Sequence, residues 1–137
     1  MISQLTVFLE NEKGRLAAAC RAVSDAGINM HALNLADTSD FGVVRMLTDT
    51  PEAAAEALRE QGYRATVTPV LAVRVPNVPG GLAKLLEFMD EQDANVEYGY
   101  CFSVNEDYAV DVLKADGSDD LEQKLTDAGF EPVRPED

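Results

Sequence analysis

The chain has 137 residues, 46% of them hydrophobic, and a formal net charge of −14 at pH 7. Because this charge repels nucleic-acid backbones and anionic membrane surfaces, we expect neither nucleic acid nor a membrane as a partner. Much of the acidity is interpreted as solvated helix faces and an acidic tail that includes Glu136 and Asp137.

Cysteine usage and hydropathy favour a cytoplasmic protein. Cys20 and Cys101 are the only cysteines, too few for a disulfide framework and without the CxxC spacing of a zinc site. The N-terminus has no signal-peptide pattern, and no apolar run approaches the about 18 residues of a spanning helix. We therefore predict a soluble, cytoplasmic chain.

The first half of the chain predicts the order strand, helix, strand, strand, helix, strand. Hydrophobicity alternates in the first segment, and apolar residues then recur at helical spacing up to a stop at Gly27. Thr50 is predicted to cap the second helix, with Pro51 at its first position. The predicted strands cover residues 2–10, 28–36, 41–48 and 63–70, and the predicted helices end near Asp25 and at Gly62.

The second half repeats this order. The stretch Asn11-Glu12-Lys13-Gly14-Arg15-Leu16 returns 66 positions later as Asn77-Val78-Pro79-Gly80-Gly81-Leu82, after a predicted strand over 71–75. The same offset, without a gap, pairs Val44 with Val110 and Met46 with Val112. One inserted residue near the last helix then aligns Gly62 with Gly129. The repeat predicts two modules, residues 1–69 and 70–137.

This order predicts an α+β fold of two tandem ferredoxin-like βαββαβ modules. Each antiparallel sheet carries two helices on one face, and we expect the two sheets side by side. The other sheet face of the second module carries Tyr98, Tyr100 and Phe102. Apolar residues on both faces predict cover by another module or subunit, so we expect a homodimer.

The repeated stretch resembles the ACT domain, a small ligand-binding module of regulated enzymes of amino-acid metabolism. Members carry a strand, then Asn-x-Pro-Gly-x-Leu, then a helix ending in Gly, then an Asn that opens the second strand. The second module matches with Asn77, Pro79, Gly80 and Leu82, and later Asn95. The first has Lys13 in place of the Pro and Arg15 in place of an apolar residue, so the second turn is the better preserved.

The resemblance implies that a free amino acid or similar effector binds where two modules meet, with no metal and no cofactor. It pairs the first turn with the start of the second strand of the other module, Asn11 with Asn95 and Asn77 with Asn29. Backbone N–H groups of Arg15 and Leu16, or Gly81 and Leu82, would hold the carboxylate, and Asn oxygens the ammonium. The implied ligand-binding residues are Asn11, Gly14, Arg15, Leu16, Asn29, Met30, Asn77, Pro79, Gly80, Gly81, Leu82, Asn95 and Val96.

Other sites have weaker support in the sequence. His31 is a single histidine without catalytic or metal-ligating partners, interpreted as a sheet-face residue or a pocket residue. The acidic stretch Asp119 to Asp127 lacks EF-hand spacing and is interpreted as a helix that Ser118 caps. The Gly80-Gly81 pair belongs to no phosphate-loop motif, which leaves nucleotide binding a weak alternative.

The predicted function is a non-catalytic sensor that binds an amino acid and regulates by changing how modules pack. A second hypothesis is a docking regulatory subunit of an amino-acid biosynthetic enzyme, such as an acetolactate synthase, or of an amino-acid-activating ligase. An enzyme of the same topology would need a phosphate-cradling loop or a nucleophile with its base. Since the sequence shows neither, we predict no enzyme activity.

Overall fold

The computed structural model describes residues 1–10, 12–37, 41–116 and 120–134. Asn11, the turn residues Thr38 to Asp40, Ser118, Asp119, Glu136 and Asp137, all used in the sequence predictions, lie outside these ranges. The chain forms two compact units, Ser3–Thr68 and Pro69–Asp137, the second joined by Met1–Ile2. We call them the N-terminal and the C-terminal module.

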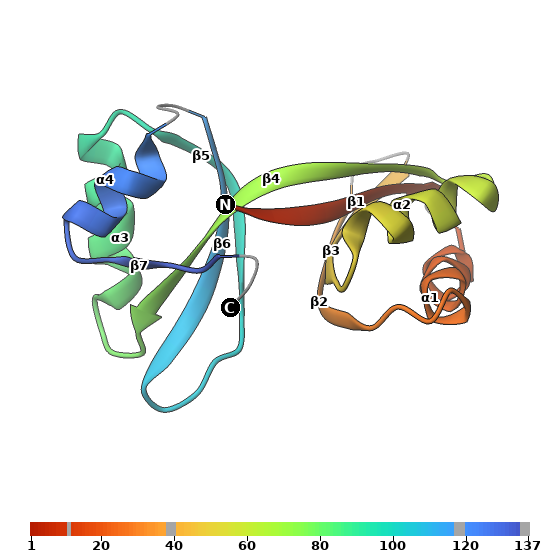
Figure 1. Ribbon diagram of the computed structural model, residues 1–137, viewed down its shortest axis with the longest axis horizontal. Helices are drawn as coiled ribbons and strands as arrows, with labels where there is room; N and C mark the ends of the chain where they lie inside the picture. Colours follow the sequence, from red (N-terminus) through yellow and green to blue (C-terminus); the bar gives the residue numbers. More distant parts are fainter. Residues whose placement is uncertain (11, 38–40, 117–119, 135–137) are drawn as a thin grey trace. The chain divides into compact units, whose positions relative to one another are not determined.

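The N-terminal module is an antiparallel sheet with two helices (Figure 1). Its strand order is β2-β3-β1-β4, and β1 pairs with β3 and β2 with β3 in antiparallel register. Its elements are β1 (Ile2–Glu10), α1 (Arg15–Asp25), β2 (Met30–Asp37), β3 (Phe41–Thr48), α2 (Pro51–Glu60) and the first part of β4 (Arg64–Pro76).

The C-terminal module repeats this plan with the order β7-β4-β6-β5 (Figure 1). It consists of the rest of β4, α3 (Gly81–Glu91), β5 (Asn95–Phe102), β6 (Tyr108–Asp116), α4 (Leu121–Asp127) and β7 (Glu131–Pro132). Both modules therefore have the predicted ferredoxin-like topology.

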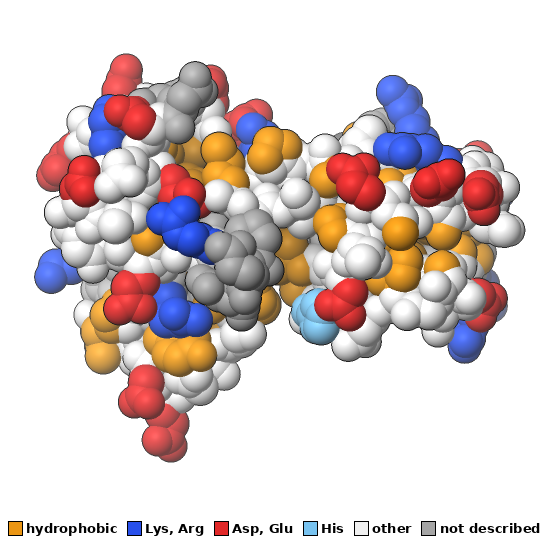
Figure 2. Space-filling model, viewed as in Figure 1, with side chains coloured by type: hydrophobic (Ala, Val, Ile, Leu, Met, Phe, Trp, Pro, Cys, Tyr) orange, Lys and Arg blue, Asp and Glu red, His pale blue; other side chains and the backbone are white. Residues whose placement is uncertain are grey.

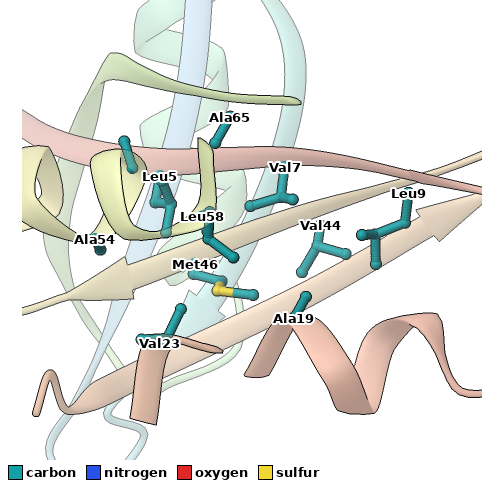
Figure 3. Close-up of a cluster of buried hydrophobic side chains, with 11 residues drawn as sticks. Leu5, Val7, Leu9, Ala19, Val23, Val44, Met46, Ala54, Leu58 and Ala65 are labelled. Atoms are coloured by element: carbon teal, nitrogen blue, oxygen red, sulfur yellow. The ribbon is translucent and has the colours of Figure 1, made fainter. Parts of the chain in front are cut away.

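Each module has its own hydrophobic core between sheet and helices. In the N-terminal module, Leu5, Val7 and Leu9 occupy every second position of β1 and pack against Ala19 and Val23 of α1 (Figure 3). The alternation sends these side chains to the helix-covered face, as a period of two requires. The C-terminal core contains the buried residues Leu71, Val73, Val75, Leu85, Met89, Ala94, Leu113, Leu121 and Leu125.

The pairing of the central strands corrects the predicted equivalence of the two modules. Leu5 of β1 lies opposite Met46, whereas its counterpart Leu71 of β4 lies opposite Leu113. Met46 therefore corresponds to Leu113 and not to Val112. The inserted residue precedes β6, in the β5–β6 connection, and does not lie near the last helix. A shift of one residue exchanges the two faces of a strand, so the correction changes which side chains of β6 face the helices.

Two further predictions were wrong in detail. Thr50 precedes α2 with a φ of 43°, but its side chain makes no capping hydrogen bond. The segments 63–70 and 71–75, predicted as two strands, form the single strand β4, which includes Pro69. Proline fixes φ in the extended range and removes only one donor, so a strand can continue through it where no ladder partner is needed.

Among the described residues, none of the helices combines the length and the apolar character that crossing a bilayer requires.

Candidate functional site

The turn between β4 and α3 is a tight connection closed by its own backbone. The N–H of Val78 donates to the Pro76 carbonyl at 2.9 Å, and the N–H of Gly81 donates to the Val78 carbonyl at 3.0 Å. Gly80 has a φ of 87°, in the left-handed region that glycine adopts at little cost. The sequence of this turn thus fixes where α3 begins.

Gly81 is required for steric reasons. A Cβ atom at this position would lie 2.3 Å from the Pro76 carbonyl oxygen, a backbone atom that cannot move away without distorting β4. The Gly81 N–H, which the sequence predicted to help hold a carboxylate, is bonded within the turn. The next N–H groups of α3, those of Leu82 and Ala83, donate to no described residue. They form the electropositive end of the helix.

Asn77 joins this turn to the β5–β6 connection. Its side-chain amide donates to the Asn105 carbonyl at 2.5 Å, and its backbone N–H donates to the Asp107 carbonyl at 3.0 Å. The side-chain oxygen of Asn77 accepts no hydrogen bond from the described residues. It can therefore still accept one from an ammonium group, the role that the sequence predicted.

A cavity of about 650 Å³ lies beside this turn. Pro79, Gly80 and Gly81 line one side together with Lys84 of α3, and Phe130 lies on the other side. Of the predicted ligand-binding residues of this turn, the structure places these three at the cavity. Leu82 is not part of its lining; its side chain is 44% exposed.

The corresponding turn of the N-terminal module has a different electrostatic environment. Gly14 again has a left-handed φ of 88°, and the Arg15 N–H donates to the Glu12 carbonyl at 3.3 Å. The Arg15 guanidinium lies 3.3 Å from the Glu10 carboxylate and 3.5 Å from that of Glu12. Its charge is thus matched within the module. The N–H groups of Leu16 and Ala17 in α1 donate to no residue that the structure describes.

The predicted residues at the second strand of each module lie away from the turn of the same module. Pro76 lies opposite Tyr108 at one end of the C-terminal sheet, whereas Asn95 lies opposite Asp116 at the other end. The eight residue steps from Tyr108 to Asp116 span roughly 25 Å of strand. Asn77 and Asn95 of one module therefore cannot contact the same small ligand.

The side chains at these strand starts differ in exposure. Asn29 and Asn95 are exposed, and the Asn29 carbonyl accepts the N–H of Asp49 at 3.1 Å. Met30 and Val96 are half-buried and pack against the cores of their modules. The two asparagines are thus accessible to a ligand, whereas Met30 and Val96 mainly complete the packing.

His31 forms a hydrogen bond with Asp49 on the surface of the N-terminal module. Its Nε2 lies 2.7 Å from Oδ1 of Asp49, and Figure 2 shows the histidine in pale blue beside an acidic side chain. No three His, Cys, Asp or Glu side chains of the described residues come together as metal ligands. Burial raises the pKa of the Cys20 thiol, whereas Cys101 is exposed.

Sequence reasoning missed one side chain, Asp111 of β6. It lies opposite Val73, so its carboxyl faces α3, and it is only 7% exposed. Burial raises the pKa of this carboxyl above its ordinary value of 3.8. The erroneous alignment, which paired Val110 with Val44, assigned Asp111 to the opposite face. A correct register would have identified it as a charge at a core position.

Several solved structures are similar to this chain. Protein BT0572 from Bacteroides thetaiotaomicron is 33% identical, with a TM-score of 0.89, over 96% of this chain and 90% of that one. The regulatory subunit of aspartate kinase from Thermus thermophilus is 18% identical, with a TM-score of 0.67, over 90% and 88% of the two chains. The same subunit from Thermus flavus is 19% identical, also with a TM-score of 0.67, over 90% and 88%.

At under 25% identity, the two Thermus structures show the shared fold alone. No curated protein matches this chain. The family of ACT domain pairs matches residues 1–130, nearly the whole chain and both repeats of the turn. The resemblance seen in the sequence is thereby confirmed, and the chain belongs to the ACT domain pair family.

Proposed function

We propose that this protein is a non-catalytic sensor that binds a free amino acid, or a similar small effector, at the turn before α3. The observation that carries this proposal is the pair of N–H groups of Leu82 and Ala83, which donate to no residue in the described part of the chain and follow the Gly80-Gly81 turn. Two such donors at a helix start favour a carboxylate. The Asn77 oxygen, on the same turn, suits an ammonium group.

A second module is proposed to complete the site. Because Asn77 and Asn95 lie at opposite ends of their own sheet, a ligand at the turn needs a strand start from elsewhere. The pairing of Asn77 with Asn29, and of Asn11 with Asn95, remains our prediction. A ligand that bridges two modules would stabilise their association by mass action, which makes effector concentration a signal.

The proposal includes a cytoplasmic homodimer without enzyme activity. Membership in the ACT domain pair family supports a regulatory role. The second candidate is a docking subunit of a biosynthetic enzyme, because two structures of the same fold are named as regulatory subunits of aspartate kinase. Co-purification of a partner enzyme from native extract would favour this candidate over a free-standing sensor.

Thermal unfolding with each of the twenty amino acids tests the sensor proposal. A cognate amino acid at 100 times its dissociation constant should stabilise the protein by about 2.7 kcal/mol, a shift of several degrees. The double variant Asn77→Ala with Asn95→Ala should lose this shift. Glu91→Ala, an exposed change at the end of α3, is the matched control and should keep it.

Two outcomes of this experiment would count against the proposal, and each has a different meaning. No shift with any amino acid would contradict the proposed function. A full shift in the double variant would leave amino-acid binding in place and rule out the assigned site.

A further inference from the structure

The cavity beside the turn before α3 has mostly apolar walls. Val78 and Pro79 of the turn and Ala83 of α3 form one side, and Ala128 and Phe130 lie on the other. Its volume of about 650 Å³ lies within the range of small-molecule sites, about 300 to 1,000 Å³. Because the transfer of apolar surface from water to such walls is favourable, the cavity favours an apolar group.

The charged side chains of this cavity wall carry opposite signs. Lys84 and Glu87 lie three residues apart on α3, and both are exposed. The remaining residues of the wall are uncharged. The wall therefore carries no net charge that would attract a charged ligand side chain.

The same region of the N-terminal module is divided into two smaller cavities, about 400 Å³ and 280 Å³ in volume. Gln61 and Tyr63 line both of them, so these two residues lie between the cavities. Their counterparts in the repeat, Ala128 and Phe130, line the single larger cavity of the C-terminal module. Alanine in place of glutamine thus accompanies an undivided cavity.

The walls of the two N-terminal cavities are also more strongly charged. At the position of Arg15 the C-terminal module has Gly81, where a larger side chain would clash with the Pro76 carbonyl. Only the C-terminal module therefore offers a large apolar space at its turn. The charged residues that line the N-terminal cavities are Glu10, Arg15, Arg21, Asp25, Glu60 and Arg64.

The C-terminal cavity adjoins the donors that are proposed to hold a carboxylate. Ala83, whose N–H donates to no described residue, belongs to the cavity wall, as do Gly80 and Gly81 directly before it on the chain. A carboxylate bound at this N–H therefore lies at the border of the cavity. The rest of the same small molecule can then extend into the cavity.

We propose that the C-terminal module selects amino acids with a large, uncharged, apolar side chain, which fills the cavity against Ala128 and Phe130. This inference rests on the proposed function for the carboxylate site and adds the class of ligand. The N-terminal module, with its divided and charged cavities, does not make this selection.

The test measures the affinity of the full chain for a series of amino acids by isothermal titration calorimetry. Alanine, norvaline and norleucine differ only in the number of methylene groups, and glutamine has a polar side chain of similar length to that of norleucine. Each methylene that enters the cavity should raise the affinity about three- to fourfold, so norleucine should bind roughly 30 to 60 times as tightly as alanine. Glutamine should bind no more tightly than alanine, because burying its amide without a partner is unfavourable.

Ala128→Gln copies the N-terminal module and tests the cavity directly. Ala128 and Gln61 follow their helices with nearly the same backbone, at φ −85° and −88°, so the variant should fold as the wild type does. It should weaken norleucine binding about tenfold and alanine binding less than about twofold, since only the longer side chain extends far into the cavity. Ala53→Gln, the same change at an exposed position of α2, is the matched control and should bind both as the wild type does.

Equal affinities of the wild type for alanine and norleucine would overturn this inference while the proposed function stands. An unchanged preference for norleucine in Ala128→Gln would also overturn it, because the ligand side chain would then lie outside this cavity.

If no amino acid binds, the proposed function fails, and an NMR titration with hexanoate decides the role of the cavity. Hexanoate has the same carbon chain as norleucine and lacks the amino group. Hexanoate binding that Ala128→Gln weakens supports the cavity as a site for apolar chains. Absence of hexanoate binding, or binding that Ala128→Gln leaves unchanged, overturns it.

Discussion

Single side chains distinguish the two modules more than their shared fold does. Arg15 at the first turn is neutralised by Glu10 and Glu12, whereas Asp111 in the other module is a carboxyl whose pKa is raised by burial. An exposed pair such as that of Arg15 contributes well under about 1 kcal/mol to stability. A lone buried carboxyl has a larger effect, and of the opposite sign.

We expect Asp111→Asn to stabilise the protein near neutral pH, with an advantage that fades in acid. Burial raises the folded-state pKa of this carboxyl above 3.8, so the folded state holds its proton more tightly than the unfolded state. Stability is therefore lost as the pH rises from about 3.8 through the raised pKa, and the loss is on the order of 1 kcal/mol for each pKa unit. Denaturant titration of both proteins from pH 3 to pH 8 would measure it.

The groups around Asp111 keep this prediction simple. On the facing flank of α3 lie Leu82, Leu85 and Leu86, which do not titrate, and Cys101 lies opposite on β5. If Asp111→Asn were more stable than the wild type by the same amount at every pH, the assigned titration of Asp111 would be contradicted.

At the scale of elements, the short turn before α3 fixes how this helix is oriented relative to β4. The close approach of Gly81 to the Pro76 carbonyl sets the angle between β4 and α3, and this angle presents the N–H groups of Leu82 and Ala83. Gly80 contributes to the geometry of the turn in a separate way, because its backbone adopts a left-handed φ.

Replacing each of these two glycines with alanine should reduce stability by a different amount. Gly81→Ala should destabilise the protein by roughly 2 kcal/mol or more, because its Cβ would clash with backbone at 2.3 Å. Gly80→Ala should cost only about 1 to 2 kcal/mol, the price of a left-handed φ, because no atom lies within 4 Å of its Cβ. Chemical denaturation of both variants gives the comparison; equal losses would refute the steric argument.

At the scale of the whole molecule, charge dominates the surface. Acidic residues number 25 against 11 basic ones, and Figure 2 shows acidic side chains on both modules. Self-repulsion of this excess opposes the compact state, and salt screens it over about 10 Å at 0.1 M.

The melting temperature should therefore rise when NaCl is added to a solution of low ionic strength. The screening of like charges raises the free energy of unfolding, and the effect should flatten once the screening length falls well below the size of a module. Differential scanning calorimetry over a salt series measures this rise. A fall in melting temperature over the same range would show that attractive ion pairs, such as those of Arg15, outweigh the repulsion.

The sequence by itself determined the order of elements, the two modules' ferredoxin-like topology and the family. Periodicity and the repeated Asn-Gly-Leu turn carry that information locally, because hydrophobic spacing and turn chemistry are properties of neighbouring residues. The strand over 41–48 and the end of the first helix at Asp25 were both predicted correctly.

Only the tertiary structure decided the register of β6, and with it the place of Asp111. The run from Val110 to Leu113 offers apolar residues on both faces, so the sequence allows two alignments that differ by one residue. Pairing with β4 selects one of them, since Leu71 and Leu113 must meet in the core. The same pairing turns the β6 carboxyl of Asp111 toward the helix-covered face of the sheet.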